Sequence, residues 1–143
     1  MKRSLVFLLF LFTVCCSWSS AQGSPRYSSV RTIVKAVNEK DADLYVMNFA
    51  EDVKVYLYES DFELRIEGRE AMRKNREAHF KRYPNVRNEI QHLVEIDNKV
   101  VMHDKVWLDP SVKEGSNIVE VFTFQEGKIV RVDVIQQKDL FQN

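Results

Sequence analysis

The order of the elements that the sequence predicts is its most constraining feature, because helical patterns dominate the first half and extended segments fill the second. Four extended segments cover residues 86–96, 99–108, 117–125 and 128–137. Turn-forming residues such as Asp97-Asn98 and Glu126-Gly127 separate them, and short turns of this kind join antiparallel neighbours. The sequence therefore predicts an α+β fold rather than alternating parallel units.

Three helices are predicted ahead of these strands. The first follows an N-cap at Ser28 or Ser29, and its apolar residues recur at helical spacing: Val30, Ile33, Val34 and Val37. Asp41 is predicted to cap a short second helix that is apolar nearly all round and therefore buried. A third helix is predicted over residues 69–83, ended by Pro84.

Alternating residues over 53–58 and 62–66 predict a further hairpin between the second and third helices. The sheet would then hold about four to six strands and curve around the helices as a cone. Its last strands are apolar on both faces, with Ile118, Phe122 and Phe124 on one and Val119 and Val121 on the other. We expect a second copy of the chain to cover the outer face, giving a homodimer through the sheet.

Residues 1–21 have the pattern of a signal peptide. Two basic residues precede an apolar run over residues 4–16, which is too short for a comfortable bilayer-spanning helix. Small residues ahead of Gln22 predict cleavage before it. An uncleaved anchor and lipidation at Cys15 or Cys16 are the alternatives.

Cleavage would leave a linker over residues 22–27 and one domain over residues 28–143. No cysteine follows residue 21, which excludes disulfides, cysteine nucleophiles and thiolate metal sites from the mature chain. We therefore expect a secreted or periplasmic protein that folds on its hydrophobic core alone and has no membrane contact after cleavage.

The charge balance argues against a polybasic nucleic-acid binder. The chain has 21 Lys and Arg and 21 Asp and Glu, so it carries no long-range field of one sign. The helix over residues 69–83 is rich in basic residues, but it contains two i,i+4 pairs, Glu70 with Lys74 and Glu77 with Lys81. Such pairs support a solvated helix face, and we expect no nucleic-acid partner.

Four short motifs occur in order along residues 30–137. They are Val37-Asn38-Glu39-Lys40-Asp41-Ala42-Asp43, Phe49-Ala50-Glu51-Asp52-Val53, Gly68-Arg69-Glu70-Ala71-Met72-Arg73 and Gly127-Lys128-Ile129-Val130. Together they resemble the nuclear transport factor 2-like superfamily, in its SnoaL-like or ketosteroid-isomerase-like branch. The resemblance implies a cone-shaped α+β barrel in which a curved mixed or antiparallel sheet wraps three N-terminal helices. It leaves the activity open, because the superfamily includes isomerases, cyclases, dehydratases, epoxide hydrolases and non-enzymatic binding proteins.

Similarity to ketosteroid isomerase can be tested at three positions. Leu57 stands where that family has its general-base Asp, and Ile33 stands where it has a catalytic Tyr. Only Glu120 matches, at a carboxylic acid on the strand before the last. Because Leu57 cannot accept a proton, steroid isomerisation by that mechanism is not expected.

Glu120 is the most informative residue for chemistry, because a carboxylate in an apolar strand needs a partner or a raised pKa. A hairpin that closes around residues 109–116 would place Lys105 opposite Glu120, and a two-residue shift would place His103 there. The intermediate register pairs Asp104 with Glu120 and is disfavoured by like charge. A proton-shuttling or oxyanion-binding site and a cross-strand salt bridge at the sheet rim both stay open.

Either favoured register also brings Trp107 to the face of Glu120. We therefore predict Glu120, His103 and Lys105 as catalytic residues. The predicted substrate-binding residues are Leu57, Val55, Trp107, Phe122 and Asn75. The three histidines of the chain, His79, His92 and His103, lack the close spacing of a metal site, so we expect neither a metal nor a cofactor.

These features predict an exported domain that binds a small apolar molecule and carries groups suited to proton transfer of the isomerase, cyclase or dehydratase type. The alternative is a non-enzymatic ligand-binding or dimeric interaction module. A solvent-connected pocket of about 300–1,000 Å³ with Glu120 on its wall would favour the first, and a sealed cavity would favour the second. The ligand, and whether the protein is an enzyme, stay open.

Overall fold

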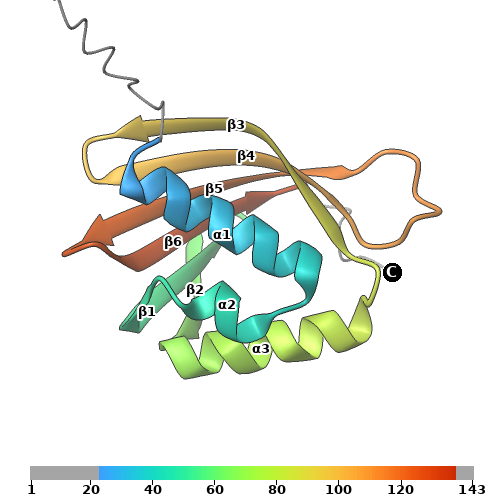
Figure 1. Cartoon of the computed structure of the whole chain (residues 1–143), viewed down its shortest axis with the longest axis horizontal. Coiled ribbons are helices and arrows are strands. Elements are labelled where there is room, and N and C mark those ends of the chain that lie inside the picture. Colours follow the sequence, from blue (N-terminus) through green and yellow to red (C-terminus); the bar gives the residue numbers. More distant parts are fainter. Residues whose placement is uncertain (1–22, 138–143) are drawn as a thin grey trace, which may run out of the picture.

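The computed structural model describes residues 23–137, which form three helices and six strands (Figure 1). In chain order they are α1 (Pro25–Glu39), α2 (Ala42–Val46), β1 (Phe49–Tyr58), β2 (Phe62–Glu67), α3 (Arg69–Arg82), β3 (Arg87–Ile96), β4 (Lys99–Trp107), β5 (Ser116–Gln125) and β6 (Lys128–Gln136). The predicted signal peptide, its cleavage site and the alternative lipidation site lie outside the described residues.

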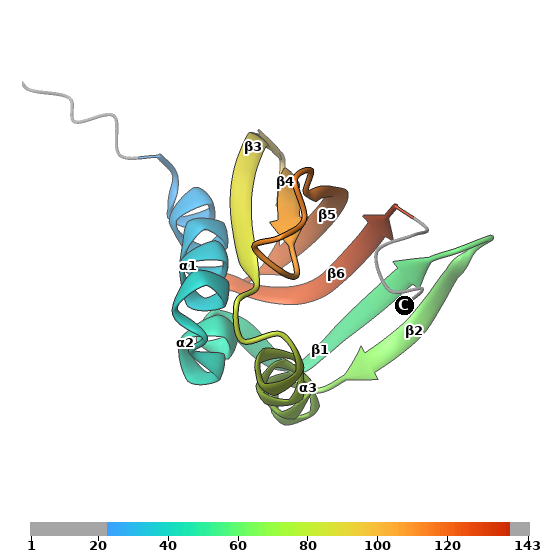
Figure 2. The same ribbon diagram turned by 90° about the vertical axis from the view of Figure 1, so that its right-hand side faces the viewer.

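The six strands form one mixed sheet in the order β2-β1-β6-β5-β4-β3. The pair β1 and β6 is parallel, and the other four neighbouring pairs are antiparallel. β2 and β3 are the edge strands, and the sheet is strongly curved when viewed from the side (Figure 2). The predicted α+β class, with a curved sheet wrapped around three helices, is confirmed.

Local residue chemistry sets the helix ends. α1 begins at Pro25, earlier than predicted, because the Ser24 side chain accepts a hydrogen bond from the Tyr27 N–H and proline suits the first helical turn. Asp41 caps α2 as predicted and accepts from the Leu44 N–H at 2.8 Å. α3 begins after Gly68, whose φ of 93° favours glycine.

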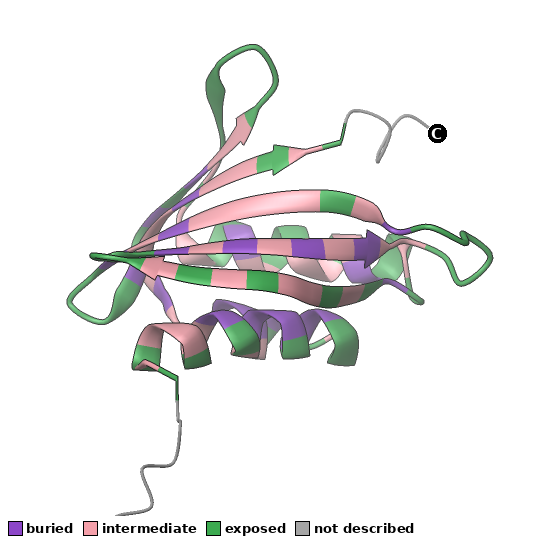
Figure 3. Ribbon diagram, turned by 90° about the horizontal axis from the view of Figure 1, so that it is seen from above, coloured by how far each residue is buried: buried purple, intermediate pink, exposed green. Residues whose placement is uncertain are grey.

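The helices cover the concave face of the sheet in two places. α1 packs on β3 and β4, whereas α3 packs on β1 and β2. Burial alternates along β4, where every second residue is buried (Figure 3). The fully buried apolar residues belong to one core cluster formed by the helices and the sheet. The largest of them are Phe49, Phe122, Ile33, Met102 and Ile129. Burial of such side chains is the main stabilising contribution to the fold.

The pairing of β4 with β5 differs from both registers that the sequence favoured. Met102 lies opposite Glu120, and His103 lies opposite Val119. Since successive strand residues point to opposite faces, this one-residue difference reverses the prediction. Asp104 shares the concave face with Glu120, while His103 and Lys105 point to the convex face.

Candidate functional site

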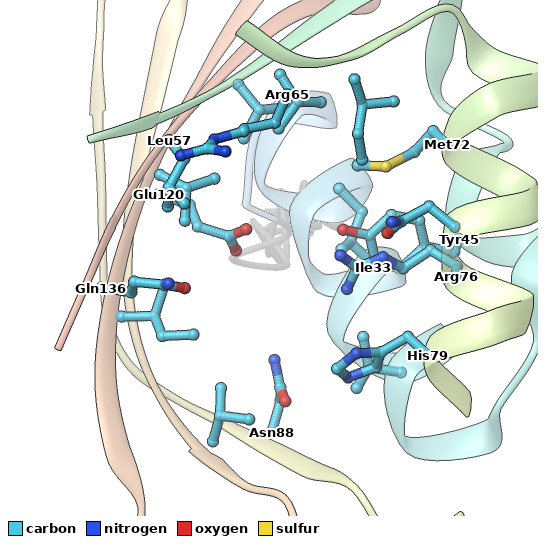
Figure 4. Close-up of a pocket in the computed structure, with 18 of the residues that line it drawn as sticks. Ile33, Tyr45, Leu57, Arg65, Met72, Arg76, His79, Asn88, Glu120 and Gln136 are labelled. Carbon is cyan, nitrogen blue, oxygen red and sulfur yellow. The ribbon is translucent and has the colours of Figure 1, made fainter. Parts of the chain in front are cut away.

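A cavity of about 490 Å³ lies between the concave face of the sheet and the helices (Figure 4). All three helices and all six strands contribute to its wall. The polar lining residues are Tyr45, Arg65, Asn75, Arg76, His79, Asn88, Asp104, Glu120 and Gln136, and the apolar ones are Ile33, Val37, Val55, Leu57, Ile66, Met72, Val106, Ile118, Val132 and Val134. The volume falls within the range of small-molecule sites.

Two exposed side chains, from β2 and α3, belong to the wall of the cavity. They are Arg65 on β2 and Asn75 on α3. Arg65 is held there by ion pairs with Glu59 and Glu63, at 2.8 and 3.0 Å. A small molecule could therefore enter past an ordered cationic side chain.

Two carboxyl groups lie on neighbouring strands deep in this cavity. Asp104 pairs with Ile118, two residues along β5 from Glu120, so the two acids are diagonal neighbours on the concave face. Asp104 is only 1 % exposed, and the Glu120 carboxylate points into the open volume (Figure 4). Like-charge proximity of this kind was the reason for expecting the two acids to lie apart.

Both carboxyl groups hold protons more tightly than usual. Burial raises the pKa of Asp104 to about 8, and the charge of Glu120 raises it further, against the hydrogen bonds that Asp104 accepts. Burial raises the pKa of Glu120 to about 7, and the nearby Arg76 guanidinium partly offsets this rise. Two like acids in one dry site cannot both ionise cheaply, so near neutral pH the pair retains about one proton.

Asn88 on β3 positions Asp104. Its Nδ2 donates to Asp104 Oδ2 at 2.8 Å. Asn88 is in turn held by α1, because its backbone N–H donates to Asn38 Oδ1 at 2.8 Å and Asn38 Nδ2 donates to the Asn88 carbonyl at 3.0 Å. The other side-chain oxygens, Asn88 Oδ1 and Asp104 Oδ1, are buried without a hydrogen-bond partner among residues 23–137. Such groups are costly unless a ligand or water satisfies them.

Three further polar side chains face the acids from the helices. Tyr45 is 4 % exposed, and its pKa is raised to about 12, mainly by burial. Arg76 lies over the Tyr45 ring at 5.1 Å, and its buried Nε has no hydrogen-bond partner in the described part of the chain. Burial and the charges of Arg76 and Arg82 lower the pKa of His79 to about 4. Tyr45 is thus a neutral hydrogen-bond donor at physiological pH, and His79 is a neutral imidazole.

Several predicted site residues do lie on this wall. Glu120, Val55, Leu57 and Asn75 all line the cavity. Phe122 is on the same face but is fully buried in the core and is not part of the lining. Leu57 points into the cavity, as the family resemblance implies. Because leucine cannot accept a proton, the β1 side of the cavity has no general base at this position.

The prediction that His103, Lys105 and Trp107 share the face of Glu120 is wrong, because the register turns them to the convex face. Trp107 instead packs against Arg87, whose guanidinium carbon lies 3.8 Å from the centroid of the indole ring. Gly115 of the β4–β5 loop approaches the same indole so closely that a Cβ there would lie 2.6 Å from it. Trp107 therefore packs against the end of the β4–β5 hairpin and does not contact the cavity.

Asp104 was not predicted as a site residue, although the sequence carries a usable signal for it. Along β4 the even positions Val100, Met102 and Val106 are uniformly apolar, whereas the odd positions include His103 and Lys105. That alternation predicts the even face as the buried one and carries Asp104 inward. The other polar residues around the acids had no comparable signal, since only the three-dimensional packing brings them together; they are Tyr45, Arg76, His79 and Asn88.

Within residues 23–137, no group of three or more His, Cys, Asp or Glu side chains could hold a metal ion. In the same part of the chain, no helix has the length and apolar character needed to cross a membrane. The polar groups that the cavity itself offers for chemistry are two acids, three amides, a phenol, an imidazole and two guanidinium groups.

The curved mixed sheet around three helices, with a pocket inside, defines the nuclear transport factor 2-like class of fold. The family model of the SnoaL-like domain matches residues 30–132. The chain therefore belongs to the SnoaL-like family, and the predicted superfamily is confirmed. None of the curated proteins matches this sequence.

Solved structures are similar over most of the chain. A cystatin-fold protein from Novosphingobium aromaticivorans has a TM-score of 0.70 and 26% identity, covering 79% of this chain and 99% of that one. A putative ketosteroid isomerase from Kribbella flavida has a TM-score of 0.66 and 17% identity, covering 80% and 78%. A putative polyketide cyclase from Sinorhizobium meliloti has a TM-score of 0.60 and 21% identity, covering 75% and 93%. The last two likenesses show the fold alone.

Proposed function

We propose that this protein is a small-molecule enzyme that catalyses proton transfer by the paired acids Asp104 and Glu120. The observation that carries the proposal is the raised pKa of two adjacent carboxyl groups in an open cavity. Strongly perturbed acids in a cleft are characteristic of general acid–base sites. The similarity to a putative ketosteroid isomerase and a putative polyketide cyclase is consistent with this class of reaction.

The two acids take different roles because their environments differ. Arg76 favours the ionised form of Glu120, whereas the charge of Glu120 keeps Asp104 protonated. Ionised Glu120 accepts a proton from a carbon next to a carbonyl group, and Asp104 donates its proton to the carbonyl oxygen. The C–H bond breaks, an O–H bond forms, and the resulting enol is reprotonated by Glu120 at a second carbon, while the enol proton returns to Asp104.

The wall also selects the substrate. Aliphatic side chains from α1, β1 and β6 would contact an apolar body, and the unsatisfied Asn88 Oδ1, Asp104 Oδ1 and Arg76 Nε would bind a polar group at its end. A small carbonyl compound with an apolar skeleton fits this division. The substrate expected from sequence, a small apolar molecule, is thereby refined to one with a polar reacting end.

The test is proton exchange in D₂O with a panel of alicyclic ketones and β,γ-unsaturated ketones, followed by ¹H NMR. We expect exchange at the carbon next to the carbonyl to exceed that in buffer, and Glu120→Gln to slow it by about 10²–10⁴-fold, as loss of a general base does. Glu126→Gln, in the exposed β5–β6 turn, is the matched control and should retain full rate.

The rate should also depend on pH as a narrow bell. It should rise as Glu120 ionises near its pKa of about 7 and fall as Asp104 loses its proton near a pKa of about 8. A rate that is the same in the Glu120→Gln variant would remove Glu120 from the mechanism. Binding of these ketones without exchange in the wild type would favour the non-enzymatic ligand-binding alternative.

Export and self-association are further parts of the proposal. The basic residues and apolar run before Gln22 support a secreted or periplasmic protein, and N-terminal sequencing of the processed chain tests cleavage there. The convex face exposes Val94, Ile96 and Ile135, which supports a homodimer through the sheet. Sedimentation equilibrium should give twice the chain mass, and a monomer at micromolar concentration would contradict the homodimer.

A further inference from the structure

The convex face of the sheet carries a histidine pair that the cavity does not use. His92 on β3 lies directly opposite His103 on β4, and the two Nδ1 atoms are 3.3 Å apart. The rings are nearly parallel, at 8°, with their centroids 5.5 Å apart. The two Nδ1 atoms are therefore much closer together than the ring centres.

A β-bulge creates this pair. The register of β3 against β4 shifts between Ile90, which faces Asp104, and His92. In an uninterrupted register Gln91 would lie opposite His103, and His92 would lie opposite Met102 and point to the concave face, because one residue of shift reverses a strand side chain. The bulge turns His92 outward beside His103. His92 is exposed and His103 is half-buried, so ions in solution can reach both.

The tautomer of His103 is fixed by a neighbouring strand. Its Nε2 lies 3.0 Å from Asn117 Oδ1 on β5. An amide oxygen only accepts, so His103 Nε2 carries the proton and its Nδ1 presents a lone pair toward His92. Metal-binding histidines use this arrangement, in which the other ring nitrogen donates to an oxygen that orients the ring.

We propose that His92 and His103 form a two-imidazole site for a late first-row divalent metal ion, with Cu²⁺ bound more tightly than Zn²⁺. Metal–nitrogen bonds of about 2.0–2.1 Å place two ligand nitrogens about 2.9 Å apart at the right angle typical of Cu²⁺ and about 3.4 Å apart at the tetrahedral angle typical of Zn²⁺. The two Nδ1 atoms, at 3.3 Å, lie within this range. Binding needs His92 to carry its proton on Nε2 and both rings, now nearly parallel, to turn until their Nδ1 lone pairs converge on the ion. Water completes the coordination.

The surroundings tolerate a cation at this place. The neighbouring cross-strand pair on the same face is Lys105 with Glu89. These two charges are opposite, so the pair adds no net charge beside the histidines. β3 is an edge strand, so His92 lies at the margin of the convex face. Sequence spacing gave no indication of this site, because the two ligands come from different strands and are brought together only by their pairing.

The experiment measures Cu²⁺ and Zn²⁺ affinity by titration calorimetry on untagged protein in a non-coordinating buffer. We expect one Cu²⁺ per chain. His92→Gln and His103→Gln should each weaken binding at least about tenfold, and Asn117→Ala by about tenfold through loss of ring orientation. His79→Gln, which alters the histidine on the other side of the sheet, should leave Cu²⁺ affinity unchanged.

Two spectroscopic measurements complement the affinities. Nitrogen-15 NMR of the metal-free protein should show the proton of neutral His103 on Nε2, and electron paramagnetic resonance of the Cu²⁺ form should show two equivalent imidazole nitrogens. Equal Cu²⁺ affinity in the wild type and in both histidine variants would overturn the proposal. So would loss of binding in His79→Gln alone. None of these readouts depends on enzymatic activity.

Discussion

The two faces of β4 carry two titratable pairs that differ in almost every physical respect. Asp104 faces the cavity beside Glu120 and is buried among apolar side chains, whereas the adjacent residue His103 faces outward beside His92. Burial raises the pKa of both acids of the concave pair, whereas the two imidazoles lie at the outer surface. Asp104 and His103 are adjacent in sequence, but the alternation of side chains along a strand places them in different environments on opposite faces of the sheet.

The comparison also separates two kinds of acid. On the concave face Asp104 is held by the amide of Asn88 rather than by a cation. On the convex face Asp133 of β6 receives bonds of 2.6–2.9 Å from the Arg131 guanidinium, which also covers the Tyr56 ring. We infer that the concave acids reduce stability in favour of function, while the convex acid contributes modestly to stability.

The largest expected difference between the faces is in packing. Phe122→Ala removes a fully buried ring from the concave side and should lower the free energy of unfolding by about 3–5 kcal/mol. Val121→Ala, at the next residue but on the half-buried convex side, should cost at most about 1 kcal/mol. Urea unfolding followed by circular dichroism measures both. A comparable cost for Val121→Ala would mean that the convex face is buried as deeply, which is the result expected if the proposed homodimer persists at the concentration of the measurement.

A smaller effect, of opposite sign, is expected at Asp104. Its folded-state pKa of about 8 lies above the unfolded value near 4. The folded state therefore binds the extra proton, and the stability this provides is complete below about pH 4 and is lost as the pH rises toward about 8. Asp104→Asn keeps the acceptor for Asn88 and removes the charge. It should raise the free energy of unfolding by at least about 2 kcal/mol at about pH 8.5, with about 5 kcal/mol as the upper limit set by the full pKa difference.

The control for this prediction is the same measurement near pH 4, where Asp104 is already neutral in the folded state. There the variant and the wild type should agree to within about 0.5 kcal/mol. If Asp104→Asn instead destabilised the protein in the alkaline measurement, the charged carboxylate would have to be favourably partnered in the cavity, and the contrast between the two faces would fail.

The smallest effect is expected from the matched substitution on the convex face. Asp133→Asn removes the negative charge of a partly exposed ion pair and should cost less than about 1 kcal/mol, an effect that decreases further in about 1 M salt. Thermal unfolding at low and high salt measures it. A cost above about 2 kcal/mol would mean that the Arg131 pair is shielded from water, and the contrast between the faces would then lose its electrostatic basis.

Sequence patterns predicted the elements better than the site, and particular residues show why. Asp41 and Pro84 mark helix ends by local chemistry, and the turn at Glu126-Gly127 joins β5 to β6 as predicted. The β4–β5 register could not be derived from the loop over residues 108–115, because a loop of that length permits several closures. A register error of one residue placed His103 on the concave face in the prediction, whereas the structure has Asp104 on that face. The register prediction was wrong because it assumed that Asp104 and Glu120 would repel each other as two charged groups. When one of the two acids keeps its proton, that repulsion is removed.

Asp104 and Glu120 must together retain about one proton at neutral pH if the cavity works as proposed. Carbon-13 NMR titration of the side-chain carboxyl carbons, assigned with the Asp104→Asn and Glu120→Gln variants, measures this directly. We predict two carboxyl signals that titrate well above about pH 5, and a downward pKa shift of Asp104 in the Glu120→Gln variant, where the neighbouring charge is gone. Two signals that titrate independently near pH 4, the ordinary range of such groups, would contradict the shared proton.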